Sequence, residues 1–277
     1  MEPTERVRVR SREGEKEKER EDVLAVEEPL EIRARPGLRA PAVSFVTTMR
    51  TPGRDEDLTA GLLFAEGVLE SRDDLKDLAV PDDPRLETEM RGNVLLATLS
   101  PEAFARAEKL RRGTVMGSAC GVCGRTSIES VIRMGELPLH SDLRVTASLL
   151  RALPERLAAR QSLFAATGGL HAAALFDREG RLLELAEDIG RHNATDKLVG
   201  HFLRRRELPL SDSLLMVSGR AGFEIVQKAY LAGIPIVAAV SAPSSLAVAL
   251  AESAGITLVG FLRGERFNLY THPRRIG

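Results

Sequence analysis

The sequence has no tryptophan, and aromatic residues make up only 4% of its 277 residues. The core must therefore be built mainly from leucine, valine, alanine and isoleucine. Only two cysteines occur, which excludes a disulfide-rich secreted scaffold. No apolar run reaches the ~18 residues of a membrane span, and the charged N-terminus lacks the apolar segment of a signal peptide. We therefore expect a soluble protein of the cytoplasm, with no membrane partner.

An excess of one charge sign is also absent. The 39 lysines and arginines nearly balance the 40 aspartates and glutamates, so the net charge is −1. This balance argues against a protein that coats nucleic acid through bulk charge. The apolar fraction of 43% and the charged fraction of 29% are typical of globular proteins. The length suits roughly two ordinary domains.

The first half predicts a charged tail and a small α+β domain. Residues 1–22 hold 15 charged side chains and almost nothing apolar after Val9, which is typical of a disordered tail. From residue 23 onward, the apolar patterns predict an N-terminal α+β domain over 23–135. The expected strands are 23–34, 42–49, 86–90 and 93–99, and the expected helices are 55–68 and 101–112. The segment 136–144 is interpreted as the linker to a second domain.

The second half, residues 136–277, alternates helices with strands. A helix is predicted at 146–164, a hairpin at 171–177 and 181–187, and a helix at 191–206. Strands at 213–217, 235–240 and 256–261 then alternate with helices at 221–232 and 244–253. Such alternation is typical of a three-layer α/β/α sandwich with a parallel or mixed sheet. We therefore expect an α/β protein with a smaller α+β domain in front.

The two cysteines form one C-x-x-C motif, Cys120-Gly121-Val122-Cys123, in a small, glycine-rich stretch. Zinc needs four ligands, and neither a second C-x-x-C nor a paired histidine spacing supplies them, so we expect no metal. A thioredoxin-like dithiol opens a helix after a strand, which this context does not suit. A sulfur carrier, which holds sulfur as a cysteine persulfide, needs a lowered thiol pKa, and nearby Arg111, Arg112 and Arg125 favour one. Two buried, inert cysteines are the structural alternative.

Three further stretches place glycine or charge at junctions between strands and helices. Residues 187–193 lead into a helix whose free N–H groups can bind an anion, although a capped helix with a solvated entry is the simpler interpretation. Gly219 and Arg220 follow a strand and can bring N–H groups and a guanidinium to a phosphate. At the end of the last predicted strand, two arginines flank a glycine, which suits a diphosphate, although a solvated turn has the same pattern. The residues of this last stretch are Phe261, Leu262, Arg263, Gly264, Glu265 and Arg266.

Together these stretches resemble the FdhD/NarQ family of formate dehydrogenase accessory sulfurtransferases. The resemblance covers residue 23 to the end and rests on several motifs in the same order. These motifs are Met49-Arg50-Thr51-Pro52-Gly53, Cys120-Gly121-Val122-Cys123-Gly124 with Ser127-Ile128-Glu129, Thr167-Gly168-Gly169-Leu170-His171-Ala172-Ala173, Glu187-Asp188-Ile189-Gly190-Arg191-His192-Asn193-Ala194, Asp196-Lys197, Ser218-Gly219-Arg220 and Tyr270-Thr271-His272-Pro273.

The resemblance implies a function. Members of this family take sulfur from a cysteine desulfurase and pass it to the molybdenum cofactor in its bis-molybdopterin guanine dinucleotide form, which then goes to formate dehydrogenase. By position, Cys120 is the implied persulfide-bearing residue, and Cys123 assists or shares the sulfur. The stretch 261–266 is implied to bind the cofactor, and Arg220 and Gly219 are suited to its phosphates. A homodimer is also implied, with the desulfurase and formate dehydrogenase as partners.

The resemblance further implies a cytidine-deaminase-like fold for the C-terminal half. In zinc deaminases, H-x-E and P-C-x-x-C supply the zinc ligands and the catalytic glutamate. The corresponding stretches here, His192-Asn193-Ala194 and residues 218–222, lack the glutamate and both cysteines. Zinc deamination is therefore not expected. Two other functions stay open: a chaperone that holds and delivers the cofactor without sulfur transfer, and a C-x-x-C dithiol oxidoreductase.

Overall fold

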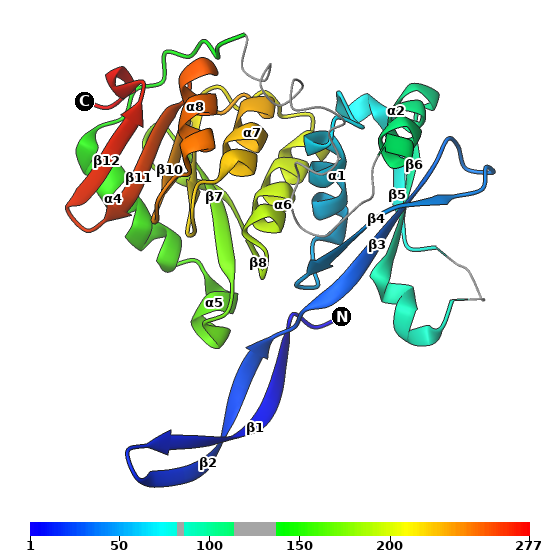
Figure 1. Ribbon diagram of the computed structural model, residues 1–277, viewed down its shortest axis with the longest axis horizontal. Coiled ribbons are helices and arrows are strands. Elements are labelled where there is room, and N and C mark those ends of the chain that lie inside the picture. The colour runs from blue at the N-terminus through cyan, green and yellow to red at the C-terminus, as the bar shows by residue number, and fades with distance from the viewer. Residues whose placement is uncertain (82–85, 114–136) are drawn as a thin grey trace.

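The larger of the two main sheets has six strands and is formed by the second half of the chain. The computed structural model describes residues 1–81, 86–113 and 137–277 (Figure 1). The strands lie in the order β12-β11-β10-β9-β7-β8, and β9, β10 and β11 run parallel to one another. Strand β7 is antiparallel to β9 and β8, and β12 is antiparallel to β11. The strands are β7 (His171–Asp177), β8 (Leu182–Asp188), β9 (Ser213–Val217), β10 (Ile236–Ala239), β11 (Thr257–Arg263) and β12 (Arg266–Thr271).

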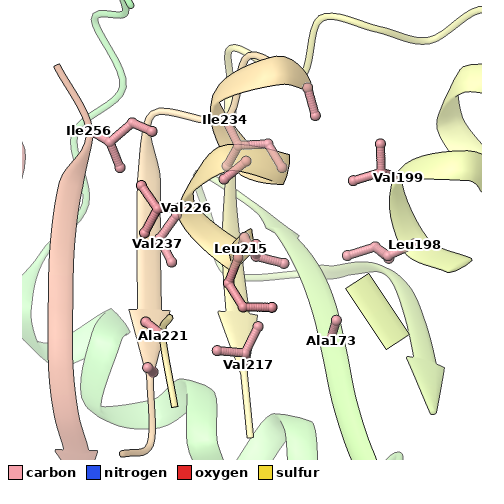
Figure 2. Packing of buried hydrophobic residues seen from close by; sticks show 14 of the residues in the cluster. Ala173, Leu198, Val199, Leu215, Val217, Ala221, Val226, Ile234, Val237 and Ile256 are labelled. Atoms are coloured by element: carbon pink, nitrogen blue, oxygen red, sulfur yellow. The ribbon is translucent and has the colours of Figure 1, made fainter. Parts of the chain in front are cut away.

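Helices pack on both faces of this sheet. One face carries α6 (Arg191–Arg204), α7 (Phe223–Leu231) and α8 (Ser245–Ser253), whose apolar side chains share a core with the sheet. Figure 2 shows Val226 of this layer beside Leu215 and Val237 of the strands. The other face carries α4 (Ala147–Ala158), which buries Leu150, Leu153 and Leu157. The prediction of a mixed α/β protein is confirmed, whereas likeness to the cytidine deaminases stays a prediction.

The first half forms a four-stranded sheet in the order β4-β3-β6-β5. Its elements are β3 (Glu28–Arg35), β4 (Val43–Arg50), α1 (Asp55–Ala65), η1 (Arg72–Asp74), β5 (Leu75–Ala79), η2 (Thr88–Asn93), β6 (Val94–Leu99) and α2 (Pro101–Gly113). The strand predicted at 86–90 is wrong, because residues 88–93 form the 3-10 helix η2. Strand β5 was not predicted, since it is short and mostly open to solvent. The domain limits 23–135 and 136–277 stay a prediction.

Two glycines let α1 and α6 pack closely across the two halves of the chain. A Cβ built on Gly200 of α6 would lie 1.9 Å from the carbonyl oxygen of Asp57 in α1. A Cβ on Gly61 of α1 would lie 2.0 Å from the carbonyl oxygen of Asp196 in α6. No real side chain tolerates such distances. The helices therefore touch backbone to backbone, and this contact joins the four-stranded sheet to the six-stranded one.

Residues 1–22 are not the disordered tail that their composition predicts. They belong to a hairpin of β1 (Thr4–Glu13) and β2 (Lys16–Ala25) that projects from the rest of the molecule (Figure 1). Its register sets opposite charges across from one another: Arg8 faces Glu21, Arg10 faces Glu19, and Arg12 faces Glu17. Each such cross-strand pair contributes about 0.2–1 kcal/mol. Composition alone misses this order because it ignores which charges the register brings together.

Two other segments differ from their predictions. The single helix expected at 146–164 is two helices, since α4 ends at Ala158 and α5 (Ser162–Thr167) follows. Beyond β11 the chain does not end in a free turn but returns as the edge strand β12, followed by η3 (Pro273–Arg275). In the part of the chain that the structure describes, no helix is both long and apolar enough to cross a membrane.

Candidate oxyanion site at the edge of the large sheet

The turns that follow the three parallel strands meet at one edge of the six-stranded sheet. The backbone N–H of Val240, after β10, donates to the carbonyl of Val217 at the end of β9 (3.1 Å). Ser241 N–H donates to the carbonyl of Gly219 (3.4 Å), and Phe261 N–H donates to the carbonyl of Ser241 (3.1 Å). Open α/β sheets bind ligands at this carboxyl edge. The predicted ligand segments around Gly219 and Phe261 therefore lie on either side of Ser241 at this edge.

The antiparallel strands bring further polar residues to the same edge. Because β7 runs opposite to β9, its first residue, His171, lies beside the end of β9. Ser218 fixes this contact, since its N–H donates to the carbonyl of Ala172 and its Oγ accepts from the Ala172 N–H, both at 2.9 Å. His171 also pairs in register with Asp188, the last residue of β8. Helix α6 starts three residues later, so Arg191 and His192 enter the site from its first turn.

Gly219 packs closely against two side chains of this edge. It is buried, and a Cβ built on it would lie 3.2 Å from Nδ1 of His171 and 3.6 Å from Cδ of Arg191. Any side chain here would have to displace the imidazole. The absence of a side chain at Gly219 thus lets His171 and Arg191 pack directly against the backbone at this edge.

The site presents positive groups that lack carboxylate partners among the described residues. Arg220 is exposed and makes no side-chain hydrogen bond or ion pair within the described part of the chain. Nε of Arg191 is buried and has no hydrogen-bond partner there. Arg263 is exposed and donates through Nε to the carbonyl of Val240 (2.9 Å). Guanidinium groups of this kind bind phosphate and carboxylate oxygens through paired N–H groups.

Two helix N-termini add to this preference for anions. Helix α6 follows Gly190 and α7 follows Gly222, and neither glycine can cap its helix with a side chain. The first N–H groups of a helix carry partial positive charge and need an acceptor. Both helices start at the edge that carries Arg191 and Arg220. The arrangement is suited to a ligand with several oxyanion groups.

The two histidines of the site are neutral at neutral pH. Burial, followed by the charges of Arg191 and Arg220, lowers the pKa of His171. Burial, followed by Arg191 and Lys228, lowers the pKa of His192 to about 3. Nδ1 of His192 lies 3.2 Å from Oε2 of buried Glu224, which suits an N–H donated by a neutral ring. Each imidazole can then both donate and accept a hydrogen bond.

A buried ion pair links the two helices that carry His192 and Glu224. Lys228 of α7 donates to Oδ1 of Asp196 in α6 at 2.6 Å, and both side chains are buried. Burial raises the pKa of Asp196 to about 6, and Lys228 opposes this shift. The pair joins α6 to α7 one turn beyond His192 and Glu224, which holds these two side chains beside one another.

Comparison with known proteins identifies the family. The model of the FdhD/NarQ family matches residues 25–277. The chain belongs to the FdhD/NarQ family. The hairpin β1–β2 lies almost entirely before the matched residues, whereas the carboxyl edge of the large sheet lies within them.

Several relatives share most of their length with this chain. A protein of Streptomyces coelicolor named sulfur carrier protein FdhD is 47% identical over 99% of this chain and 95% of its own length. Proteins with the same name from Mycobacterium tuberculosis and Sulfolobus acidocaldarius are 47% and 42% identical, each over 92% of both chains. The crystal structure of a putative formate dehydrogenase accessory protein from Desulfotalea psychrophila has the same fold. It gives a TM-score of 0.76 at 23% identity and covers 100% of both chains.

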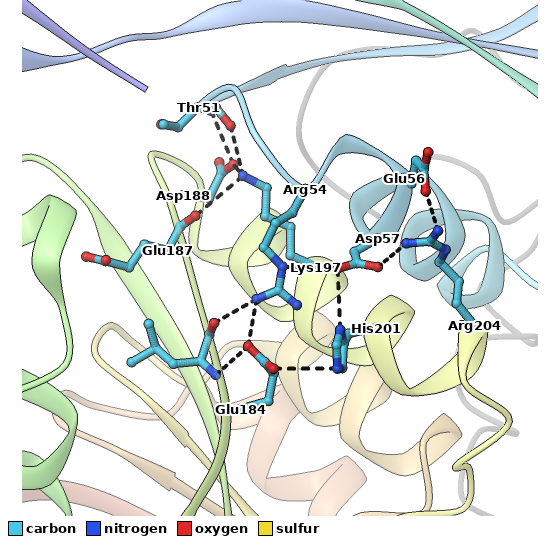
Figure 3. A network of polar contacts seen from close by, with 11 residues as sticks. Thr51, Arg54, Glu56, Asp57, Glu184, Glu187, Asp188, Lys197, His201 and Arg204 are labelled. Atoms are coloured by element: carbon cyan, nitrogen blue, oxygen red, sulfur yellow. Dashed lines mark hydrogen bonds and ion pairs between the residues drawn. The ribbon is translucent and has the colours of Figure 1, made fainter. Parts of the chain in front are cut away.

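Much of the motif that runs from Glu187 to Asn193 is structural (Figure 3). Asp188 is fully buried and pairs with Nζ of Lys197 at 2.7 Å. It also accepts the backbone N–H of Thr51 (3.2 Å), and Lys197 donates to the carbonyl of Thr51 (2.8 Å). Glu187 accepts the first N–H groups of α5 from Leu163 and Phe164. Within this motif, Arg191 and His192 are the side chains left for a ligand.

The residues predicted to bind the cofactor divide into two groups. Gly219, Arg220, Phe261 and Arg263 meet at the carboxyl edge, as described above. Leu262 is fully buried in the core, so its side chain does not face a ligand.

The remaining predicted residues form the turn between β11 and β12. Gly264 has a left-handed backbone (φ 51°), Glu265 pairs with Arg151 of α4 (3.1 Å), and Arg266 is exposed. Cys120 and Cys123 lie outside the described residues.

Sequence reasoning did not select His171, Arg191, His192 or Glu224 as site residues. They enter through the antiparallel β7–β9 pairing and the first turns of two helices, which depend on tertiary register. The available signal for His171, Arg191 and His192 was their place in the motifs 167–173 and 187–194, whereas Glu224 lies in neither motif. Among the described residues, no group of three or more histidines, cysteines or acidic residues is arranged to hold a metal ion.

Proposed function

We propose that this protein is a sulfur carrier. It accepts sulfur on Cys120 from a cysteine desulfurase and transfers it to the molybdenum cofactor, in its bis-molybdopterin guanine dinucleotide form, for the maturation of formate dehydrogenase. Membership of the FdhD/NarQ family and relatives named sulfur carrier protein FdhD support the sulfur step. We further propose that it acts in the cytoplasm as a homodimer, with a cytidine-deaminase-like C-terminal half.

The arginines at the carboxyl edge of the six-stranded sheet are the observation that supports this substrate. The dinucleotide substrate brings two diphosphate groups. Guanidinium groups are offered to them by Arg191, whose buried Nε has no hydrogen-bond partner among the described residues, and by exposed Arg220 and Arg263. Gly219 lets His171 and Arg191 pack against the backbone at this edge, which holds Arg191 in the site. The residues therefore fit the substrate's phosphates.

The first chemical step needs no added oxidant or reductant. The Cys120 thiolate attacks the terminal sulfur of the desulfurase persulfide. The donor's S–S bond breaks, its cysteine leaves as a thiolate, and the new S–S bond leaves Cys120 as a persulfide. This step requires a thiolate at Cys120, which nearby arginines in the sequence favour.

The decisive experiment is sulfur loading followed by mass spectrometry without reductant. The protein is incubated with a cysteine desulfurase and cysteine, and intact and peptide masses are recorded. We expect one added sulfur atom on the peptide that contains Cys120. Cys120→Ala should abolish the gain. Cys123→Ala, which changes the other cysteine of the same motif, should retain sulfur on Cys120.

A second arm separates sulfur transfer from cofactor binding. Arg220→Gln with Arg263→Gln removes two guanidinium groups from the edge and leaves both cysteines. We expect normal sulfur loading but at least about tenfold weaker binding of the cofactor, because charge-assisted hydrogen bonds are lost. Cofactor binding without any sulfur on Cys120, with a desulfurase shown to be active on another acceptor, would contradict the sulfur-carrier proposal. That result would instead support a delivery chaperone.

A further inference from the structure

A polar pocket lies at the edge of the six-stranded sheet opposite to the carboxyl edge. Strand β12 returns antiparallel to β11, so Thr271 pairs beside Leu258 near the start of β11. Residues 141–144 and 270–275, with Glu252, line a cavity of about 640 Å³ there. The motif Tyr270-Thr271-His272-Pro273, to which the proposed function assigns no role, forms one wall. Pockets of this volume commonly hold small molecules.

Hydrogen bonds to backbone carbonyls hold the walls of this pocket in place. Val145 N–H donates to the carbonyl of Arg275 (2.9 Å), and Gly277 N–H donates to the carbonyl of Val145 (3.0 Å). The carbonyl of His272 accepts from Thr257 Oγ1 (2.7 Å), and its imidazole Nε2 lies 2.8 Å from the carbonyl of Glu252. His272 also has a left-handed backbone (φ 43°), although it precedes a proline. Such strain in a non-glycine residue is often found at ligand sites.

Three arginines line the pocket without carboxylate partners among the described residues. Arg144 and Arg274 are exposed, and neither makes a side-chain hydrogen bond or ion pair within that part of the chain. Arg275 is half-buried and donates through Nη1 only to the carbonyl of Gly255 (2.9 Å) and to Thr257 Oγ1 (3.2 Å). Its Nε is buried and has no hydrogen-bond partner in the described part of the chain. A partly buried guanidinium that meets only neutral acceptors is stabilised further when an anion lies beside it.

The acidic residues of the pocket do not supply this compensation. Glu252 lies 3.7 Å from Nε2 of His272 and is mostly exposed. Asp142 is exposed and makes no ion pair within the described residues. The hydroxyls of Ser141 and Tyr270 add neutral polar groups to the lining. The pocket thus combines three cations with two exposed carboxylates, neutral polar groups and an aromatic ring.

We propose that this pocket binds a small molecule that carries phosphate groups, at a site separate from the carboxyl edge. Guanidinium groups match the paired oxygens of phosphate, and Tyr270 can cover an apolar part of the ligand. The inference does not rest on sulfur transfer by Cys120. The two sites lie at opposite ends of β11, so they can be occupied at the same time.

Inorganic pyrophosphate is the probe for this site, and calorimetric titration is the measurement. The full-length protein with Arg220→Gln and Arg263→Gln serves as background, because these changes weaken pyrophosphate binding at the carboxyl edge. We expect saturable binding in this background. Adding either Arg144→Gln or Arg274→Gln should weaken it at least about tenfold. Both arginines are exposed and unpaired in the described structure, so neither change should unfold the protein.

Arg39→Gln is the matched control, since Arg39 is an exposed arginine of the first half without a described partner. It should leave pyrophosphate affinity unchanged. Absence of binding in the background, or equal affinity in the Arg144→Gln, Arg274→Gln and Arg39→Gln variants, would overturn the proposal. Sulfur loading on Cys120 is recorded for the same variants. Loading that persists while pyrophosphate binding is lost separates this site from the proposed function.

Discussion

His192 shows how burial can outweigh a neighbouring carboxylate. Although Glu224 lies 3.2 Å from its Nδ1, burial and then Arg191 and Lys228 lower the pKa of the imidazole to about 3. In the unfolded chain the ring protonates near pH 6.5, so acid favours the unfolded state. The stabilisation that neutral His192 gives above pH 6.5 is therefore lost progressively as the pH falls toward 3. Wild-type protein should lose on the order of 2–3 kcal/mol from this group by pH 4.

His192→Gln tests this prediction, since glutamine keeps a polar side chain that does not titrate. Urea unfolding midpoints at pH 7, 5.5 and 4 should fall less steeply for the variant than for the wild type. Ring-carbon NMR signals of His192, assigned by their absence from the variant, should show no titration between pH 8 and 5. A titration midpoint near 6.5 would show that Glu224 holds a charged imidazole instead.

The close contact between helices α1 and α6 leaves no space for a methyl group at Gly200. Gly200→Ala would place a Cβ 1.9 Å from the carbonyl oxygen of Asp57, so the helices must separate. Alanine normally stabilises a helix interior by up to about 1 kcal/mol over glycine. Here we expect a net destabilisation of about 2–3 kcal/mol or more from overpacking, measured by urea unfolding. Gly222→Ala, with a φ of −80° and no atom within 4 Å of its Cβ, is the control and should change stability little. Equal stability of the two variants would contradict the close helix contact.

Elements that are buried on both sides were predictable, and exposed ones were not. Strands β7 and β9 have the bounds that their apolar runs predict, because their interior residues are almost all buried. Strands β5 and β12 lie at sheet edges and bury only one side chain each, so they carry no such run. Candidate ligand residues such as Gly219 and Arg263 could be found because they follow parallel strands. His171 could not, because the antiparallel pairing that moves it to the same edge is set by tertiary contacts.

At the scale of the whole molecule, one buried ion pair links the two sheets. Asp188 ends β8 of the large sheet, and Thr51 follows β4 of the small one. Lys197 contacts both, through Oδ2 of Asp188 at 2.7 Å and the carbonyl of Thr51 at 2.8 Å. Figure 3 shows Lys197 between these partners. No local pattern in the sequence indicates this link, because its members lie more than a hundred residues apart.

Lys197→Met removes the cation and keeps an apolar side chain of similar length. Asp188 is then a buried carboxylate without its ion-pair partner, so we expect a loss of about 3–5 kcal/mol of unfolding free energy. Adding Asp188→Asn to Lys197→Met removes the uncompensated charge and should restore part of this loss. Urea unfolding followed by circular dichroism gives the free energies. Because the contact between α1 and α6 still joins both sheets, the single variant should unfold in one transition at lower urea. A loss below about 1 kcal/mol, in the range of an exposed pair, would show that the ion pair is not buried in solution.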